Sequence, residues 1–369
     1  MCKTNMKKSL EVFTFIIPSL ESGGMERVMS EIIKYISKKK HTECHLVLYG
    51  RTRKIFYDLP NNVKIYKPHF KFNNKYRSWM TIETMSFIRS TIKEIKPNIV
   101  LSFGERWNNL VLLSLYGLKI STFISDRSSP NKNHGLIHNN LRRVLYPQAT
   151  GVIAQTEKAK ELFKTQFNNS NIQVIGNPIR EIMNINDVKR ENIVVSVGRL
   201  INTKHFDRLI DIFSKAETKD WKLIIIGGDS NKQSNSLRLY NQIKELKLEN
   251  KIILKDVQKN IDEHLLKASI FTFTSSSEGF PNVIGEAMSA GLPVIAYDCL
   301  AGPSEMIEDG KNGYLIPLFD DTLFVNKLQN LIDNKKQREK MGSYAKESIK
   351  KFSTERICEQ FYNFITSNS

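Results

Sequence analysis

The sequence has few cysteines and no long apolar run. Four of its 369 residues are cysteines (Cys2, Cys44, Cys299 and Cys358), and they lie far apart in the chain. This spacing excludes the paired patterns of zinc and redox motifs, and it favours a reducing compartment over a disulfide framework. No stretch approaches the roughly 20 apolar residues that a membrane-spanning helix needs. We therefore expect a cytoplasmic chain that does not cross a membrane.

Acidic residues are scarce relative to basic ones, and the net charge is +17. Such an excess predicts anionic partners. Residues 51–97 contain eleven Lys and Arg against three Asp and Glu, with Phe70, Phe72, Tyr76 and Trp79 among them. This mixture is typical of a surface that contacts the headgroups of an inner membrane, although a solvated lysine-rich face has the same composition. No nucleic-acid-binding motif accompanies the charge, so nucleic acid is not an expected partner.

Apolar runs alternate with helical patterns along both halves of the chain, which is long enough for two cores. This alternation predicts an α/β protein with two doubly wound parallel sheets, that is, two Rossmann-like domains facing a cleft. The crossing between domains is expected near Asn177-Pro178, because proline ends regular structure. The predicted domains are residues 1–177 and 178–352, followed by a last helix over residues 353–369.

One strand-turn-helix unit in the second half has a pattern suited to an anion. Residues 281–290 predict a helix between two buried strands. Because Pro281 suits a first helical turn, the N–H groups of Asn282, Val283 and Ile284 are expected to lack partners within the helix. Free N–H donors at the positive end of a helix dipole favour a phosphate.

Two carboxylates border the same turn. Glu278 lies in the turn, and Glu286 lies about one helical turn past its end. Both can reach one crevice at the carboxyl ends of the strands. Since carboxylates accept hydrogen bonds from paired hydroxyls, a ligand that carries both phosphate and sugar would explain the whole pattern.

The complete stretch resembles the signature of retaining glycosyltransferases of the GT-B fold, family 4. The resemblance rests on Glu-Gly-Phe-Pro-Asn at residues 278–282 and Glu-Ala-Met-Ser-Ala-Gly-Leu-Pro at residues 286–293. It implies a donor-binding second domain in which Phe280 and the helix start contact the donor. Glu286 would hold the ribose hydroxyls and Glu278 those of the transferred sugar. In this family the last helix crosses back to the first domain.

Two cations follow the first strand of the second half. Gly198-Arg199-Leu200 with Lys204 is similar to the family element that holds the donor's diphosphate, and both side chains could meet in one crevice. Sugar-nucleotide enzymes that depend on a divalent ion commonly carry Asp-x-Asp, and the chain has no such motif. We therefore expect a reaction that needs neither a metal nor another cofactor.

Two glycine turns complete the expected donor cleft. Gly23-Gly24-Met25-Glu26 follows the first strand, where glycine lets the backbone approach a bound group. It is similar to the Gly-Gly-x-Glu element of bacterial family 4 enzymes, which lines the cleft opposite the diphosphate, so Gly24 is a donor-binding candidate. Gly227, in the Gly-Gly-Asp turn of residues 227–229, belongs to a loop that surrounds the base and ribose in this family.

The first-domain side of the reaction departs from many relatives. They carry a histidine near residues 125–130, where this chain has Ser-Asp-Arg-Ser-Ser-Pro. A subgroup with Arg followed by Pro at this point, associated with amino-sugar transfer in surface-polysaccharide pathways, is more similar. We take Asp126 and Arg127, together with Glu278, as the catalytic candidates.

These observations favour a retaining glycosyltransferase that uses a UDP-sugar, with N-acetylhexosamine as the favoured sugar. Its acceptor would be a lipid-linked or growing glycan of a cell-surface polysaccharide, reached by peripheral contact with the inner membrane. Two alternatives stay open. One is a glycoside hydrolase or phosphorylase with Glu278 and Glu286 as paired acids. The other is a peripheral membrane scaffold with a vestigial nucleotide pocket.

Overall fold

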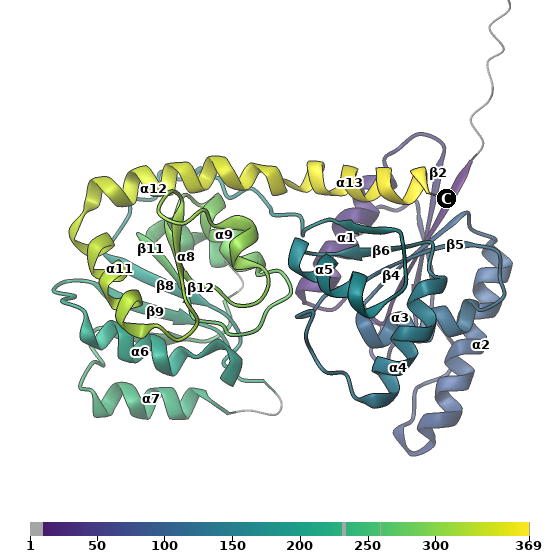
Figure 1. Ribbon diagram of the computed structural model, residues 1–369, viewed down its shortest axis with the longest axis horizontal. Helices are drawn as coiled ribbons and strands as arrows, with labels where there is room; N and C mark the ends of the chain where they lie inside the picture. Colours follow the sequence, from purple (N-terminus) through teal and green to yellow (C-terminus); the bar gives the residue numbers. More distant parts are fainter. Residues whose placement is uncertain (1–9, 231–233, 259, 369) are drawn as a thin grey trace, which may run out of the picture. The chain divides into compact units, whose positions relative to one another are not determined.

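The chain folds into two compact units in the computed structural model, which describes residues 10–230, 234–258 and 260–368 (Figure 1). Unit 1 comprises Met1–Pro178 with Thr354–Ser369, and unit 2 comprises Ile179–Ser353. The domain boundaries predicted from the sequence, after residues 177 and 352, each lie one residue before the boundaries in the structure. Cys2 lies outside the described residues, whereas Cys44, Cys299 and Cys358 are buried free thiols.

Unit 1 is built on a parallel sheet whose described strands have the order β3-β2-β1-β4-β5-β6-β7. The strands are β1 (Glu11–Ile17), β2 (Thr42–Leu48), β3 (Val63–Tyr66), β4 (Ile99–Phe103), β5 (Ser121–Ser125), β6 (Gly151–Ala154) and β7 (Ile172–Val174). The helices are α1 (Gly24–Ile36), η1 (Asn74–Tyr76), α2 (Arg77–Ile95), α3 (Glu105–Leu115), α4 (Leu136–Leu145), η2 (Tyr146–Gln148), α5 (Glu157–Gln166) and α13 (Thr354–Ser367). Every residue of β4 is buried, as expected for a parallel strand covered on both faces.

Unit 2 repeats this architecture with described strands in the order β10-β9-β8-β11-β12-β13. The strands are β8 (Ile193–Val197), β9 (Lys222–Ile226), β10 (Ile252–Lys255), β11 (Ile270–Phe273), β12 (Val294–Tyr297) and β13 (Gly313–Ile316). The helices are η3 (Asn202–Lys204), α6 (Phe206–Lys215), α7 (Ser236–Glu245), α8 (Ile261–Lys267), α9 (Asn282–Ser289), α10 (Pro303–Met306), α11 (Asp321–Asp333), α12 (Lys335–Ser348) and η4 (Ile349–Phe352). All pairings between these strands are parallel, which confirms the predicted fold class.

The strand order reverses direction at one point in each sheet. In unit 1, β1 pairs with β2 on one side and β4 on the other. In unit 2, β8 lies between β9 and β11 in the same way. At such a point the loops after the two central strands diverge, and a crevice opens at their carboxyl ends. The candidate residues of unit 2 gather around this point.

The last helix, α13, belongs to unit 1. Its side chains Ile357, Phe361 and Ile365 are fully buried. Phe361 packs against Phe103 of β4 with ring centroids 6.0 Å apart, and Phe364 packs edge-on against Phe123 of β5 at 5.5 Å. The apolar side of α13 therefore completes the hydrophobic core of unit 1, which is the domain that the family resemblance assigns to this helix.

Three details differ from the sequence-based expectations. The helix predicted over residues 281–290 begins at Asn282 and ends at Ser289. Neither β7 nor α7 was predicted, because β7 is three residues long and α7 is mostly polar with two buried side chains.

In the parts of the chain that the structure describes, none of the helices combines the length and the apolar character needed to cross a bilayer.

Candidate functional site

Glu278 and Lys204 form an ion pair at the carboxyl edge of the unit 2 sheet. Lys204 Nζ lies 2.6 Å from Glu278 Oε1, and the Ser275 hydroxyl donates to the same oxygen at 2.6 Å. Both charged side chains are 16% exposed, so the pair is shielded but still reaches the surface. The Lys204 ammonium also lies over the Phe273 ring, 4.9 Å from its centroid.

The loops that carry this pair are joined by hydrogen bonds. The backbone N–H of Ser276 donates to the Thr203 carbonyl at 2.9 Å, and the Thr274 hydroxyl donates to the Lys204 carbonyl at 2.8 Å. The His205 ring and the Ser276 hydroxyl lie 2.8 Å apart. The loop after β8 is therefore fixed against the loop after β11, across the point where the strand order reverses.

The two predicted diphosphate ligands have different environments. Lys204 lies in η3, before α6 begins at Phe206. It points at Glu278, and an ammonium has three N–H donors, so the pairing leaves donors for a second acceptor. Arg199 follows β8 and is exposed to solvent.

The start of α9 corrects part of the predicted anion site. The N–H of Ile284 donates to the Pro281 carbonyl at 3.0 Å, so it is not a free donor, and the Ile284 side chain is fully buried. Asn282 and Val283 are half-buried at the first two helical positions. Phe280 was expected to contact the donor, but it is buried against Phe352 with ring centroids 5.2 Å apart. Phe280 therefore anchors the turn to the core.

Glu286 has a partner that sequence reasoning missed. Arg180 Nε lies 3.4 Å from Glu286 Oε1, and the two terminal nitrogens of Arg180 bind the two carboxylate oxygens of Asp262, one of them at 2.5 Å. Arg180 is thus clamped between α8 and α9. No local signal marks Arg180, because its partners lie 82 and 106 residues away in the sequence.

The glycine turn after β9 is required by close packing. A Cβ atom at Gly227 would overlap the carbonyl oxygen of Gly198. Gly227 and Gly198 therefore bring the ends of β9 and β8 into direct backbone contact. Asp229 accepts hydrogen bonds from the N–H groups of Asn235 and Ser236 at 2.8 and 3.0 Å, which supports the start of α7.

A third loop closes the site next to α9. Gly302, with φ of +108°, lies against Pro281, and a Cβ atom there would overlap the proline ring. Cys299 is buried in this loop, and burial raises its pKa to about 12, with a further contribution from the negative charge of Glu278. The loops after β8, β11 and β12 therefore lie close together around Glu278.

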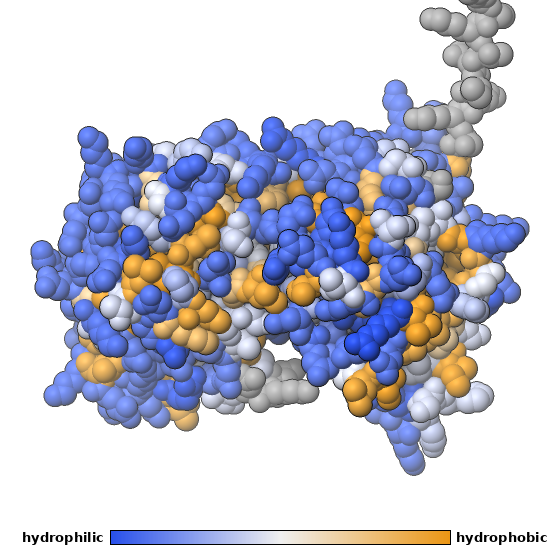
Figure 2. Space-filling model, viewed as in Figure 1, coloured by the Kyte–Doolittle hydropathy of each residue, from blue (hydrophilic) through white to orange (hydrophobic). Residues whose placement is uncertain are grey.

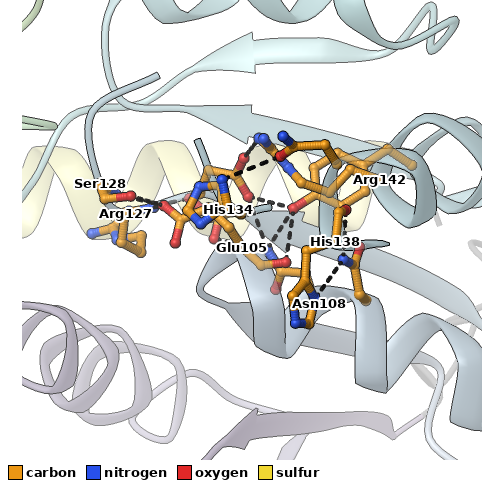
Figure 3. A network of polar contacts seen from close by, with 12 residues as sticks. Glu105, Asn108, Arg127, Ser128, His134, His138 and Arg142 are labelled. Atoms are coloured by element: carbon orange, nitrogen blue, oxygen red, sulfur yellow. Dashed lines mark hydrogen bonds and ion pairs between the residues drawn. The ribbon is translucent and has the colours of Figure 1, made fainter. Parts of the chain in front are cut away.

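In unit 1, Asp126 is buried and is not placed to meet a substrate, contrary to its selection as a catalytic candidate. It is 3% exposed, pairs with Arg142, and accepts hydrogen bonds from the Tyr146 hydroxyl at 2.6 Å and the Asn108 amide at 3.1 Å (Figure 3). Burial raises the pKa of Asp126, while the charge of Arg142 opposes this shift. The network fixes α4 to the end of β5.

Arg127 is held by groups of its own unit. One terminal nitrogen donates to the Asn177 amide oxygen at 2.5 Å, and the guanidinium lies over the Phe103 ring, 4.3 Å from its centroid. The backbone N–H groups of Arg127 and Ser128 both donate to Glu105, at 2.8 and 2.6 Å (Figure 3). Burial opposes ionisation of Glu105, but these hydrogen bonds and the Ser128 hydroxyl prevail and lower its pKa.

The glycine turn after β1 is shaped by Glu26. Helix α1 begins at Gly24, which is exposed, and a Cβ atom at Gly23 would overlap the Glu26 carboxylate. The Tyr57 hydroxyl donates to the Gly23 carbonyl at 2.9 Å. Burial raises the pKa of Glu26. The predicted turn is present, with its acidic side chain folded back on the helix start.

Two family models match the chain. "Glycosyl transferases group 1" covers residues 178–348, and "Glycosyltransferase Family 4" covers residues 22–181. Together they span nearly all of both units. The chain is a family 4 glycosyltransferase with the GT-B fold.

Two curated relatives match this glycosyltransferase along almost their full length. The amylovoran biosynthesis glycosyltransferase AmsD of Erwinia amylovora is 28% identical over 93% of this chain and 96% of the relative. The N-acetylgalactosamine-N,N'-diacetylbacillosaminyl-diphospho-undecaprenol 4-alpha-N-acetylgalactosaminyltransferase of Campylobacter jejuni is 27% identical over 95% and 98%. Both relatives are named as transferases, and their lengths are similar to that of this chain.

Solved structures share the fold of this glycosyltransferase. The lipopolysaccharide outer core galactosyltransferase WaaB superposes with a TM-score of 0.79 and 22% identity, covering 97% of this chain and 100% of WaaB. HepE from Anabaena, solved in complex with UDP, has a TM-score of 0.79 and 18% identity over 97% and 100%. At these identities the likeness concerns the fold.

The buried network predicts a large stability loss on removing one of its charges. Asp126→Asn should lower the free energy of unfolding by about 3 to 5 kcal/mol, because Arg142 would remain buried without a counter-charge. Urea denaturation measures this. Asp207→Asn, which breaks the exposed pair with Arg238, is the control and should cost less than about 1 kcal/mol. An Asp126→Asn enzyme that is fully stable but inactive would instead restore Asp126 as a catalytic candidate.

Proposed function

We propose that this glycosyltransferase moves a sugar from UDP to a lipid-linked or growing glycan during cell-surface polysaccharide synthesis, with retention of the anomeric configuration. The observation that carries the proposal is the Lys204 and Glu278 pair beside the start of α9, where a cation and a carboxylate border one crevice. HepE, which shares this fold, has been solved with UDP. N-acetylhexosamine is the proposed sugar, as the Campylobacter relative is named for N-acetylgalactosaminyl transfer to a diphospho-undecaprenol acceptor.

Charge development during transfer explains the proposed roles in unit 2. As the bond to the diphosphate breaks, negative charge grows on the leaving phosphate, and preorganised cations stabilise it best. Lys204, Arg199 and the first N–H groups of α9 would supply this positive potential. Lys204 and Ser275 both contact Oε1 of Glu278, so Oε2 would be the oxygen that meets the sugar hydroxyls or the positive charge at the anomeric carbon.

Recognition of the nucleotide would use the Arg180, Asp262 and Glu286 cluster. Glu286 would accept hydrogen bonds from the ribose hydroxyls, and Arg180 would hold its carboxylate in one orientation. Gly227 would let the donor approach the backbone at the end of β9. In unit 1, Gly24 would contact the donor, and the backbone loop of Arg127 would form the acceptor side, with Glu105 fixing that loop.

The enzyme is proposed to work in the cytoplasm at the inner membrane surface, where a lipid-linked acceptor would be found. The excess of cations in residues 51–97 supports contact with anionic headgroups. A hydrolase that uses Glu286 as a proton donor is less well supported, because Glu286 is already paired with Arg180. The scaffold alternative differs from our proposal in a single measurable property, which is turnover.

Removing the Glu278 carboxylate should separate binding from turnover. We expect Glu278→Gln to lower kcat by about 100-fold or more, since the amide keeps the size but loses the charge. UDP affinity by calorimetry should change less than about threefold. Glu308→Gln, which removes an exposed charge paired with Lys311, is the control. Normal UDP binding with no turnover by the wild type on any lipid-linked acceptor would support the scaffold alternative instead.

Arg180 should affect nucleotide recognition more than chemistry. Lysine cannot reproduce the two-pronged contact with Asp262, so Arg180→Lys should weaken UDP binding by about tenfold. The same variant should bind 2′-deoxy-UDP with a smaller loss of affinity, so the ratio of the two affinities should fall relative to wild type. Its kcat at saturating donor should stay within about threefold of the wild-type value. Arg238→Lys on α7 is the matched control. An unchanged preference between the two nucleotides would show that Arg180 does not position Glu286.

The cationic donor site predicts activity without a divalent ion. No group of three or more His, Cys, Asp or Glu side chains among the described residues could hold a metal. We expect the transfer rate in excess EDTA to stay within about twofold of the rate with added Mg²⁺ or Mn²⁺, whereas Lys204→Ala should lower it by about 100-fold. A rate that collapses in EDTA and recovers on adding the ion would contradict the cation clamp.

A further inference from the structure

The sheet of unit 1 has its own point of strand-order reversal, between β1 and β4. In an open parallel sheet, ligands bind outside the carboxyl ends of the strands at such a point. The segments that follow β1, β2 and β4 begin there, at Pro18, Tyr49 and Gly104. Gly24 is the one residue of these segments that we assign to the donor. The carboxyl edge of this sheet is therefore a natural place for a second ligand.

Trp107 lies at this edge, in the first turn of α3, and is 43% exposed. The buried Tyr49 ring packs against the indole in a T-shaped arrangement, with centroids 5.9 Å apart. A Cβ atom at Gly104, where φ is +95°, would come within 2.9 Å of the indole and 3.3 Å of the Met25 sulfur on α1. Side chains that follow β1, β2 and β4 therefore meet around Trp107, and part of the indole remains in solvent.

Polar groups accompany Trp107 in the first turn of α3. Arg106 is exposed, and its guanidinium donates to the His134 carbonyl at 3.3 Å. Glu105 holds the Arg127 backbone loop (Figure 3). A pyranose ring has an apolar face of C–H groups and a rim of hydroxyls, so an aromatic ring beside charged hydrogen-bonding groups suits a sugar. The indole also carries one N–H donor of its own.

Exposure alone does not distinguish Trp107 from other apolar side chains. Figure 2 shows hydrophobic patches between hydrophilic residues on the visible face of unit 1. Trp79 on α2 is even more exposed, at 69%. What marks Trp107 is its place at the strand-order reversal, together with the glycine and the buried tyrosine that support its ring. A ring already held in one orientation loses little conformational freedom when a ligand stacks on it.

We propose that Trp107 is the platform on which a sugar ring of the acceptor glycan stacks in unit 1. The C–H face of one pyranose would lie against the electron-rich face of the indole. Hydroxyls at the rim of that sugar would meet the polar groups at the start of α3. This inference rests on the proposed function, and it names a residue that selects the acceptor by its chemistry, namely a neutral pyranose with an unobstructed C–H face.

The donor fits this platform less well than the acceptor does. The face of an indole carries partial negative charge, so it does not attract a diphosphate. The cations proposed for the diphosphate, Arg199 and Lys204, belong to unit 2. The Arg127 backbone loop, which Glu105 fixes to the start of α3, is already on the proposed acceptor side. A neutral sugar of the acceptor therefore agrees with both the charge and the position of Trp107.

The first test is binding of a soluble oligosaccharide. The chain has three tryptophans, and Trp221 is buried, so in a Trp79→Phe protein the exposed indole is that of Trp107. Adding chitotriose should move the tryptophan emission of this protein to shorter wavelength, because stacking removes water from the indole. Ribitol, which has hydroxyls but no ring, should cause no shift. The shift should persist when UDP-N-acetylglucosamine occupies the donor site.

A substitution series separates stacking from simple apolar contact. Chitotriose affinity by calorimetry should fall at least tenfold in Trp107→Leu but only about threefold in Trp107→Tyr, because leucine is apolar and has no flat ring. Trp79→Leu is the matched control and should bind like the wild type. With a lipid-linked acceptor, Trp107→Leu should raise the acceptor KM at least tenfold, while kcat at saturating acceptor stays within about threefold. Unchanged UDP affinity and thermal unfolding of the variants exclude misfolding.

Several outcomes would overturn the inference. They are no emission shift with chitotriose, equal chitotriose affinity in Trp107→Leu and wild type, or equal losses in the leucine and tyrosine variants. Loss of the shift on adding UDP-N-acetylglucosamine would assign Trp107 to the donor instead. Transfer with an unchanged acceptor KM in Trp107→Leu would defeat this inference and leave the proposed function standing. Chitotriose binding through Trp107 without any transfer by wild type would do the reverse.

Discussion

The ion pair of Lys204 with Glu278 depends on the reversal of strand order at β8, and the rest of the donor site depends on that pair. The strands β8 and β11 are neighbours in the sheet, although residues 198–269 lie between them in the sequence. The loops after β8 and β11 meet only because of this pairing. A backbone hydrogen bond from the Ser276 N–H to the Thr203 carbonyl joins the two loops without a ligand. A charge held in place in this way can stabilise a transition state without reorganisation.

Helix α9 connects this site to the two places where the chain passes between units. Ile179, the first residue of unit 2, donates its N–H to the Phe352 carbonyl at 2.8 Å, next to the second crossing. A Cβ atom at Gly285 on α9 would lie 2.6 Å from the Ile179 side chain, so a glycine there allows this close packing. The Ser289 hydroxyl bonds the backbone of both Arg180 and Ile182. The helix that carries Glu286 is therefore fixed to both crossing segments.

Buried charge has a different use in each unit. In unit 1, the pairing of Arg142 with Asp126 is nearly inaccessible, and it fixes helix α4 to the end of β5. In unit 2, Lys204, Glu278 and Arg180 are paired but still reach the surface, where a ligand can join the pairing. A fully buried pair mainly specifies one packing arrangement, whereas a partly exposed pair can exchange partners at low cost. The pair of Asp126 and Arg142 therefore has a structural role, whereas the pair of Lys204 and Glu278 belongs to the candidate site.

The sequence alone determined the two parallel sheets, the crossing near Pro178, and the turn that carries Glu278 and starts α9. These features are encoded locally, because alternating apolar runs, a proline at a helix start and glycines in turns act within a few residues. Tertiary structure alone decided that Asp126 is an internal counter-charge, that Phe280 and Ile284 belong to the core, and that Arg180 holds Glu286. It also decided that Leu136 and Ile137 at the start of α4 are exposed, whereas Leu145 at its end is buried. Each of these outcomes is set by partners that are distant in sequence, up to 106 residues for Arg180 and Glu286, and no local pattern records which side chains the folded sheets bring together.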